Sequence, residues 1–185
     1  MSSVIVRSFD YSADADGAAR LDASFSTRCK FAVEKSAEGL ILATVALEAD
    51  IEKRFPLVLN RNGWTEAFAI AEGVALRGFI ATAVSEWNKR LIIREFFVDR
   101  PHRRRGFGRR LLERAVKRGT KLGMTTAFVE TSNLNHPGVI AYQRLGFALC
   151  GFDLSLYAGA LCPGEFALFL SRDLKGVDAP REAKG

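Results

Sequence analysis

A glycine-containing turn between an apolar strand and a basic amphipathic helix constrains this chain more than any other feature. The apolar run at residues 91–98 predicts a strand, and residues 107–122 carry apolar side chains at helical spacing. The turn between them reads Arg103-Arg104-Arg105-Gly106-Phe107-Gly108. The first turn of a helix has backbone N–H groups without intrahelical partners, and the helix dipole adds partial positive charge there. The segment therefore predicts an anion site, where glycines allow close approach and arginines add charged donors.

Other glycine-rich phosphate loops fit this turn less well. A P-loop requires Gly-Lys-Ser/Thr after its second glycine, whereas Arg109 and Arg110 follow here. A dinucleotide fingerprint requires a third glycine and an acid about 20 residues further on. Taken alone, the motif is also compatible with a solvated basic helix start.

Positive charge is concentrated around the same turn. The chain has a net charge of +6, and residues 100–146 contain eleven Lys/Arg against two Asp/Glu. This distribution favours a polyanionic ligand, with nucleic acid as the generic alternative. Because the sequence has no zinc-binding pattern and no aromatic-rich RNA-binding motif, we expect no nucleic-acid partner.

The length and composition predict one domain. Residues 1–174 are long enough for a sizeable core, and residues 175–185 are expected to form a flexible tail. No apolar run approaches the roughly 20 residues that span a bilayer, and no signal-peptide pattern begins the chain, so no membrane association is expected. Cys29, Cys150 and Cys162 lack metal-ligand spacing, which predicts reduced thiols, no metal and a cytoplasmic location.

Hydrophobic periodicity and turn residues predict an α/β or α+β fold with a mixed sheet. Asp14 or Asp16 is expected to cap the first helix. The predicted strands are 3–9, a hairpin over 31–47 turning at 37–39, 66–71, 76–84, 90–98, 125–131, 147–157 and 166–171, and the predicted helices are 16–25, 106–122 and 137–145.

A second motif follows the basic helix and the next strand. It reads Asn135-His136-Pro137-Gly138-Val139-Ile140-Ala141-Tyr142-Gln143-Arg144-Leu145-Gly146-Phe147. Together with the arginine-glycine turn, this segment resembles the GNAT superfamily of N-acetyltransferases over about residues 65–171. The resemblance implies a central mixed, mostly antiparallel twisted sheet flanked by helices, with acetyl-CoA as co-substrate.

A closer resemblance, to the streptothricin acetyltransferases, spans nearly the whole chain. It rests on these segments: 22–31, Trp87-Asn88-Lys89-Arg90, His102-Arg103, Glu130-Thr131, 149–153, Leu156-Tyr157 and Gly164-Glu165. These enzymes acetylate an amine on the β-lysine part of an antibiotic and so confer resistance. The resemblance implies a small-molecule amine as acceptor.

The resemblance also implies roles for individual residues. The pyrophosphate of acetyl-CoA would lie on the backbone of Arg103, Arg104, Arg105, Gly106, Phe107, Gly108 and Arg109. Phe96, Phe97 and Val98 would pair with the pantetheine arm like an added strand. Asn135 would lie near the same arm, although capping of the helix at Pro137 explains it equally well. Tyr142 would protonate the departing thiolate, whereas tyrosines in this position are otherwise core residues.

The reaction also requires a group that takes a proton from the amine. Glu130 is the first candidate, because an ionised carboxylate in an apolar strand is costly unless it is paired; an arginine could equally satisfy it. Glu95 is a second candidate. Trp87, Asp153, Tyr157 and Glu165 complete the residues expected to line the acceptor pocket.

Two positions depart from the family pattern. Arg94 stands where the streptothricin enzymes carry a glutamate, and Glu95 should face the other way unless a bulge re-aims it. Arg104 stands where the family usually has glycine. The first departure supports an alternative acceptor, such as a protein N-terminus or a polyamine. A separate alternative is a non-catalytic protein on the same scaffold that binds acyl-CoA or nucleic acid. A homodimer is a further expectation.

Overall fold

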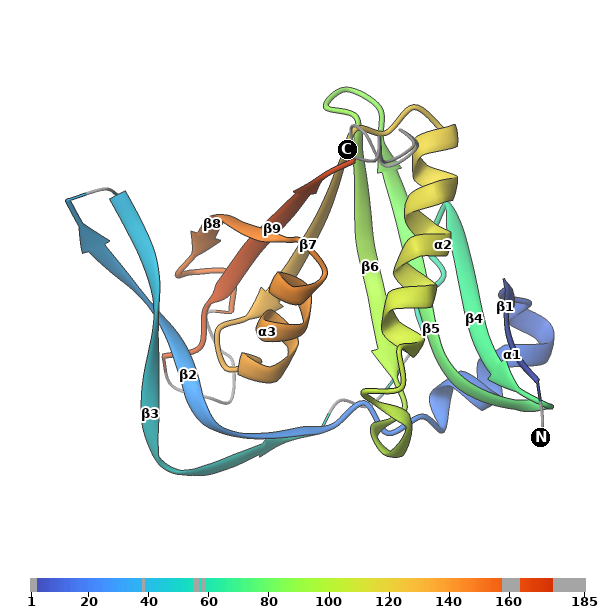
Figure 1. Ribbon diagram of the computed structural model, residues 1–185, viewed down its shortest axis with the longest axis horizontal. Helices are drawn as coiled ribbons and strands as arrows, with labels where there is room; N and C mark the ends of the chain where they lie inside the picture. Colours follow the sequence, from blue (N-terminus) through green and yellow to red (C-terminus); the bar gives the residue numbers. More distant parts are fainter. Residues whose placement is uncertain (1–2, 38, 55–56, 58, 158–163, 175–185) are drawn as a thin grey trace, which may run out of the picture.

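The computed structural model describes residues 3–37, 39–54, 57, 59–157 and 164–174, and the predicted tail at 175–185 lies outside them. Seven strands form one sheet in the order β1-β4-β5-β6-β7-β9-β8 (Figure 1). The strands of this sheet are β1 (Val4–Ser8), β4 (Glu66–Glu72), β5 (Ala75–Ser85), β6 (Arg90–Val98), β7 (Thr126–Ser132), β8 (Ala148–Asp153) and β9 (Ala167–Asp173). Adjacent strands are antiparallel except for β6 and β7. The predicted mixed, mostly antiparallel sheet of an α+β fold is therefore confirmed.

The basic helix α2 (Phe107–Lys121) covers one face of the sheet. Its apolar stripe is buried as the spacing predicts, and it ends before Gly123, which has a φ of +80°. Helix and sheet approach closely at Gly119, where a Cβ atom would lie 2.7 Å from the Leu91 side chain. The helix α3 (His136–Arg144) packs into the same core through Val139.

The helix α1 (Tyr11–Ala19) contributes to a second core on the opposite face, and its start differs from the prediction. The cap is Asp10, not Asp14 or Asp16, because the Asp10 carboxylate accepts hydrogen bonds from the N–H groups of Ser12 and Ala13 at 3.0 and 3.4 Å. Asp14 is buried instead and forms an ion pair with Arg7 at 2.5 Å. The prediction was wrong because three nearby aspartates offer the same capping chemistry.

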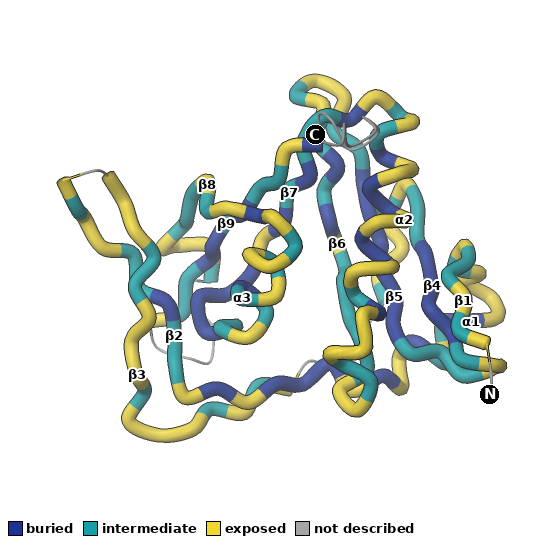
Figure 2. The backbone as a smooth tube through the Cα atoms, viewed as in Figure 1, coloured by how far each residue is buried: buried dark blue, intermediate teal, exposed yellow. Residues whose placement is uncertain are grey.

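A long hairpin, β2 (Phe25–Ser36) and β3 (Gly39–Lys53), sweeps away from the main sheet and passes α3 (Figure 1). Its turn is where the sequence predicts it, with Ser36 opposite Gly39, but both strands are longer than expected. Asn133, after β7, anchors the hairpin: its side chain donates to the carbonyl of Phe31 at 3.1 Å, and its carbonyl accepts from the N–H of Phe31. Much of β3 is exposed (Figure 2).

Candidate active site

The turn predicted to bind an anion is built from free main-chain donors. A short 3-10 turn, Arg100–His102, connects β6 to the start of α2. Arg104 and Gly106 adopt left-handed φ values of 63° and 80°, which fold the backbone back onto the helix start. The N–H groups of residues 104–109 have no acceptor in the described part of the chain. These donors and the helix dipole together form a site suited to phosphate groups.

The arginine side chains of this turn divide into two groups. Arg103 donates to the carbonyls of Val98 at 3.0 Å and Ser24 at 2.7 Å, so its guanidinium fastens the turn to the end of β6 and to the residue before β2. Arg105 bonds Glu72 at 3.0 Å. The prediction that the arginines act as phosphate donors therefore needs correction for Arg103, whose guanidinium is bound to backbone oxygens. Arg104 and Arg109 are exposed, and their side chains have no hydrogen bond or ion pair within the described residues.

Beside this turn, β6 and β7 separate. They pair only from Arg90 opposite Thr126 to Ile93 opposite Val129, and Figure 1 shows the two strands diverging beyond that point. Within the part of the chain that the structure describes, the edge of β6 from Phe96 to Val98 therefore has no strand paired with it on the β7 side. An extended chain can occupy such an edge as an added strand. The unpaired end of β6 is followed by the 3-10 turn Arg100–His102, which connects it to the donors at the start of α2.

A β-bulge lies at the point of separation. Ala81 of β5 pairs with Glu95 and the next residue, Thr82, pairs with Ile93, so Arg94 is the extra residue. A bulge that can re-aim the Glu95 side chain is therefore present in β6. Ile93 and Phe96 both pack in the core beneath α2. Arg94 and Glu95 therefore both lie between two core positions, where a regular strand would have only one residue.

Glu95 is half-buried on the face of the sheet that carries α1, because its partner Ala81 belongs to the core on that face. It has no hydrogen bond or ion pair within the described residues. Burial raises the pKa of the Glu95 carboxyl above its ordinary value. A carboxylate with a raised pKa and no partner is a suitable proton acceptor near neutral pH.

Tyr142 lies on α3 and packs against two rings, with centroid distances of 6.0 Å to Phe96 and 5.5 Å to Phe147. Its hydroxyl has no hydrogen-bond partner within the described residues. Burial, and secondarily the negative charge of Glu130, raise the pKa of Tyr142 well above 10. The phenol therefore stays protonated at physiological pH and remains available as a donor.

Glu130 begins a polar cluster on the other side of the opening. It directly follows Val129, the last residue of β7 that pairs with β6, and it is exposed. Tyr157 donates a hydrogen bond to it, so a phenol, rather than the arginine considered from the sequence, bonds this carboxylate. Glu165, only 5 % exposed, forms an ion pair with Lys53 at the end of β3. Burial, the hydrogen bond to Glu130 and the charges of Glu130 and Glu165 raise the pKa of Tyr157 above its ordinary value.

Three other predicted site residues are placed differently. Asn135 caps α3, accepting from the N–H of Gly138 at 3.1 Å and donating to Thr131 at 3.0 Å, so the capping alternative is confirmed. Asp153 accepts from the hydroxyl and the N–H of Ser155 and from the N–H of Leu156 in the turn after β8, and these hydrogen bonds lower its pKa. Trp87 is 88 % exposed in the turn between β5 and β6, at the opposite end of β6 from the arginine-glycine turn.

Lys53 is the site residue that the sequence did not reveal. It lies 112 positions from Glu165, in a segment whose sequence reads as irregular. No local pattern could have found this pair, because only the curvature of the β2–β3 hairpin brings the two side chains together.

Comparison with known proteins identifies the class to which this fold and site belong. Residues 30–147 match the model of the acetyltransferase (GNAT) family, and the chain belongs to that family. The predicted fold and enzyme class are thereby confirmed.

The relatives of this chain within the family are similar along nearly its whole length. It is 34 % identical to the streptothricin acetyltransferase of Streptomyces lavendulae over 168 residues, covering 85 % of this chain and 89 % of that protein. Its structure resembles the crystal structure of nourseothricin acetyltransferase with a TM-score of 0.82 and 32 % identity, covering 94 % and 99 % of the two chains. It also shares the fold of a putative streptothricin acetyltransferase from Bacillus anthracis solved with acetyl coenzyme A, with a TM-score of 0.81, 23 % identity and coverage of 92 % and 99 %.

Proposed function

We propose that this enzyme transfers the acetyl group of acetyl-CoA to a primary amine of a streptothricin-type antibiotic. One observation carries the proposal: free main-chain donors at the start of α2 lie next to the unpaired end of β6, where the Tyr142 ring packs against Phe96. The similarity to streptothricin and nourseothricin acetyltransferases supports the acceptor class.

In this proposal the donor molecule lies along the opening. Residues 104–109 bind its pyrophosphate through their N–H groups, with Arg104 and Arg109 adding charge. The free edge of β6 at Phe96–Val98 holds the pantetheine arm. Asn135, occupied as a cap, contributes by fixing the start of α3, which carries Tyr142. The thioester is thereby positioned between α3 and the bulge.

The acceptor amine needs to lose a proton, because an alkyl ammonium has a pKa of about 10.4 in water. Glu95 accepts this proton, directly or through a water molecule, since its carboxylate has no other partner within the described residues. The neutral amine then attacks the thioester carbonyl, and a main-chain N–H near Phe97 and Val98 stabilises the oxyanion. Tyr142 donates a hydrogen bond to the departing sulfur as the C–S bond breaks, which stabilises the thiolate of CoA.

The acceptor enters from the side that carries Glu130, Tyr157 and Glu165. Glu130 is exposed and held by Tyr157, and it faces an ammonium without competition from an arginine within the described residues. Glu165 holds Lys53 in place at the base of the hairpin. Asp153 orders the turn that carries Tyr157. A cationic acceptor is therefore favoured on electrostatic grounds.

A different acceptor has one specific observation in its favour. Arg94 is exposed at the point where β6 and β7 separate, next to the proposed path of the amine. A less cationic acceptor, such as a protein N-terminus, would be repelled less by this guanidinium. An Arg94→Glu variant with unchanged streptothricin turnover would show that this position does not select the acceptor.

The proposal also includes the surroundings of the enzyme. Within the described residues no helix is long and apolar enough to span a membrane. Cys29 and Cys150 are free thiols there, which supports a cytoplasmic location. The exposed strand β3 carries no charged side chain at residues 39–47, and this supports a homodimer formed by edge-to-edge pairing of β3. Light scattering on the wild type and on Val45→Lys tests the dimer.

The experiment that tests the function measures CoA release from acetyl-CoA with streptothricin as acceptor. We expect saturable release with the antibiotic and a thermal shift with acetyl-CoA alone. A thermal shift without turnover on streptothricin would contradict the proposed acceptor. The absence of both would contradict the proposed donor.

A further inference from the structure

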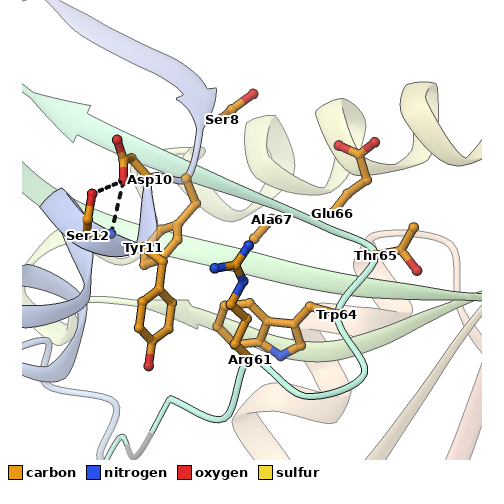
Figure 3. A pocket seen from close by; sticks show the side chains of 10 residues that line it. Ser8, Asp10, Tyr11, Ser12, Arg61, Trp64, Thr65, Glu66 and Ala67 are labelled. Carbon is orange, nitrogen blue, oxygen red and sulfur yellow. Dashed lines mark hydrogen bonds between the residues drawn. The ribbon is translucent and has the colours of Figure 1, made fainter.

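A second polar pocket lies outside the opening between β6 and β7. It is a half-open surface pocket with a volume of about 540 Å³, which is within the range of small-molecule sites. Phe9, Tyr11 and Trp64 form an aromatic wall with centroid distances of 6.2 to 6.4 Å. Figure 3 shows the guanidinium of Arg61 between the Tyr11 and Trp64 side chains, and Asp10 beside them.

This pocket shares a face of the sheet with Glu95. The N–H of Phe9 donates to the carbonyl of Ala67, Ala67 pairs with Ala81, and Ala81 pairs with Glu95. Residues directly opposite each other in antiparallel strands point to the same face. Two strand spacings separate Ala67 from Glu95, a distance of about 10 Å. The pocket and the proposed base therefore lie within the reach of one extended ligand.

Aromatic packing continues along this face. Phe79 packs against both Phe9 and Trp64, with centroids 5.6 and 6.2 Å away, and against Phe97 at 5.7 Å. Phe97 lies two positions after Glu95 on β6. Through Phe79, the aromatic wall is thus in packing contact with the strand that carries the proposed base.

The polar groups of the pocket define the ligand chemistry. The guanidinium of Arg61, 5.8 Å from the Tyr11 ring centroid, has no hydrogen bond or ion pair within the described residues. Hydrogen bonds from Ser12 and Ala13 lower the pKa of Asp10 and use only one of its oxygens there. Arg61 can donate to a carbonyl oxygen and Asp10 can accept from an N–H group, and both residues line the pocket, so its polar groups suit an uncharged planar group such as an amide. The Trp64 and Tyr11 rings provide a surface for stacking.

We infer that this pocket is a remote acceptor subsite that binds an uncharged planar amide-type group about 10 Å from the reacting amine. The inference rests on the proposed acetylation of an extended amine. Binding energy gained here holds the far end of the acceptor while its amine reaches Glu95 and the thioester.

Steady-state kinetics with Arg61→Ala test the subsite. Loss of a charged hydrogen-bond donor is expected to raise the KM for streptothricin about fivefold or more, with kcat and the KM for acetyl-CoA nearly unchanged. Lys117→Ala, which removes an exposed cation from α2, is the matched control and should leave all three values unchanged. Equal streptothricin KM values in the two variants would overturn the subsite.

Tryptophan fluorescence provides a test that does not require turnover. The chain contains two tryptophans, Trp64 in the pocket and Trp87 at the far end of β6. Titration with streptothricin is expected to change the emission of Trp87→Phe and not that of Trp64→Phe. No change in Trp87→Phe, or an equal change in both variants, would overturn the subsite. A positive titration without acetylation would instead contradict the proposed reaction and leave the binding site supported.

Discussion

Tyr142→Phe isolates the role of the phenol, because the substitution removes one oxygen and keeps the ring. The ring contacts with Phe96 and Phe147 remain available to phenylalanine. The hydroxyl has no hydrogen bond to lose within the described residues. We therefore expect a melting temperature within about 2 °C of the wild type, since the substitution keeps the ring packing and breaks no hydrogen bond within the described residues.

The size of the kinetic effect follows from the raised pKa of Tyr142. A thiol has a pKa of about 8.5 and an unperturbed phenol about 10, so complete proton transfer to the thiolate is uphill by at least about 2 kcal/mol. The hydroxyl therefore acts mainly by donating a hydrogen bond to the sulfur as negative charge develops. Hydrogen bonds to charged groups contribute about 1.5–3 kcal/mol, so kcat is expected to fall by about 10- to 150-fold.

The assay is single-turnover acetylation followed by CoA release, which separates chemistry from product release. Tyr157→Phe is the matched control, because its hydroxyl bonds Glu130 and not the leaving group in this mechanism. It should change the acceptor KM more than kcat. A fall in kcat of less than about threefold in Tyr142→Phe would show that the phenol is not the donor. A fall beyond about 10³-fold would refute the reasoning that hydrogen bonding outweighs full proton transfer.

Four further predictions concern the bulge and the turn. Glu95→Gln should abolish the acid limb of the kcat/KM profile, which in the wild type lies above the ordinary glutamate pKa because burial raises it; a retained limb would assign the base elsewhere. The same raised pKa means that the ionised form destabilises the fold above the unfolded pKa, so Glu95→Gln should raise the melting temperature at pH 7 and not at pH 4. Arg103→Ala should lower the free energy of unfolding by about 2–3 kcal/mol through its lost bonds to backbone carbonyls, whereas Arg104→Ala should cost under about 0.5; equal values in urea denaturation would contradict this assignment. Arg104→Gly should be more stable than Arg104→Ala by about 0.5–1 kcal/mol in the same assay, because glycine adopts the left-handed φ of 63° without strain; the reverse order would argue against that strain.

The sequence was sufficient where a local pattern determines the structure. The apolar stripe of α2 and the glycines that flank it predict the helix and its anion site, because helical spacing needs only one segment. The strands before it follow from apolar runs and turn residues. The first helix was misplaced because Asp10, Asp14 and Asp16 compete for one capping role, and only the ion pair of Asp14 with Arg7 decides between them.

The acceptor side could not be predicted from local patterns, because its contacts join distant segments. Glu130 and Tyr157 are 27 positions apart, and Lys53 and Glu165 are separated by most of the chain. The pocket at Trp64 likewise combines a loop before β4 with the start of α1. These groups meet only after the sheet has formed and the hairpin has curved around α3.

The bulge on β6 bears directly on the arginine that replaces the family glutamate. In a regular strand, residues 93 and 95 would face the same side, and Glu95 would point into the core beneath α2. The extra residue shifts this alternation, so Ile93 and Phe96 take the core positions and Glu95 joins the face of Ala81. We infer that the strand thereby keeps a carboxylate on the acceptor side although Arg94 stands in the earlier position. The exposed Arg94 is then free to influence which acceptor enters, while Glu95 retains the chemistry.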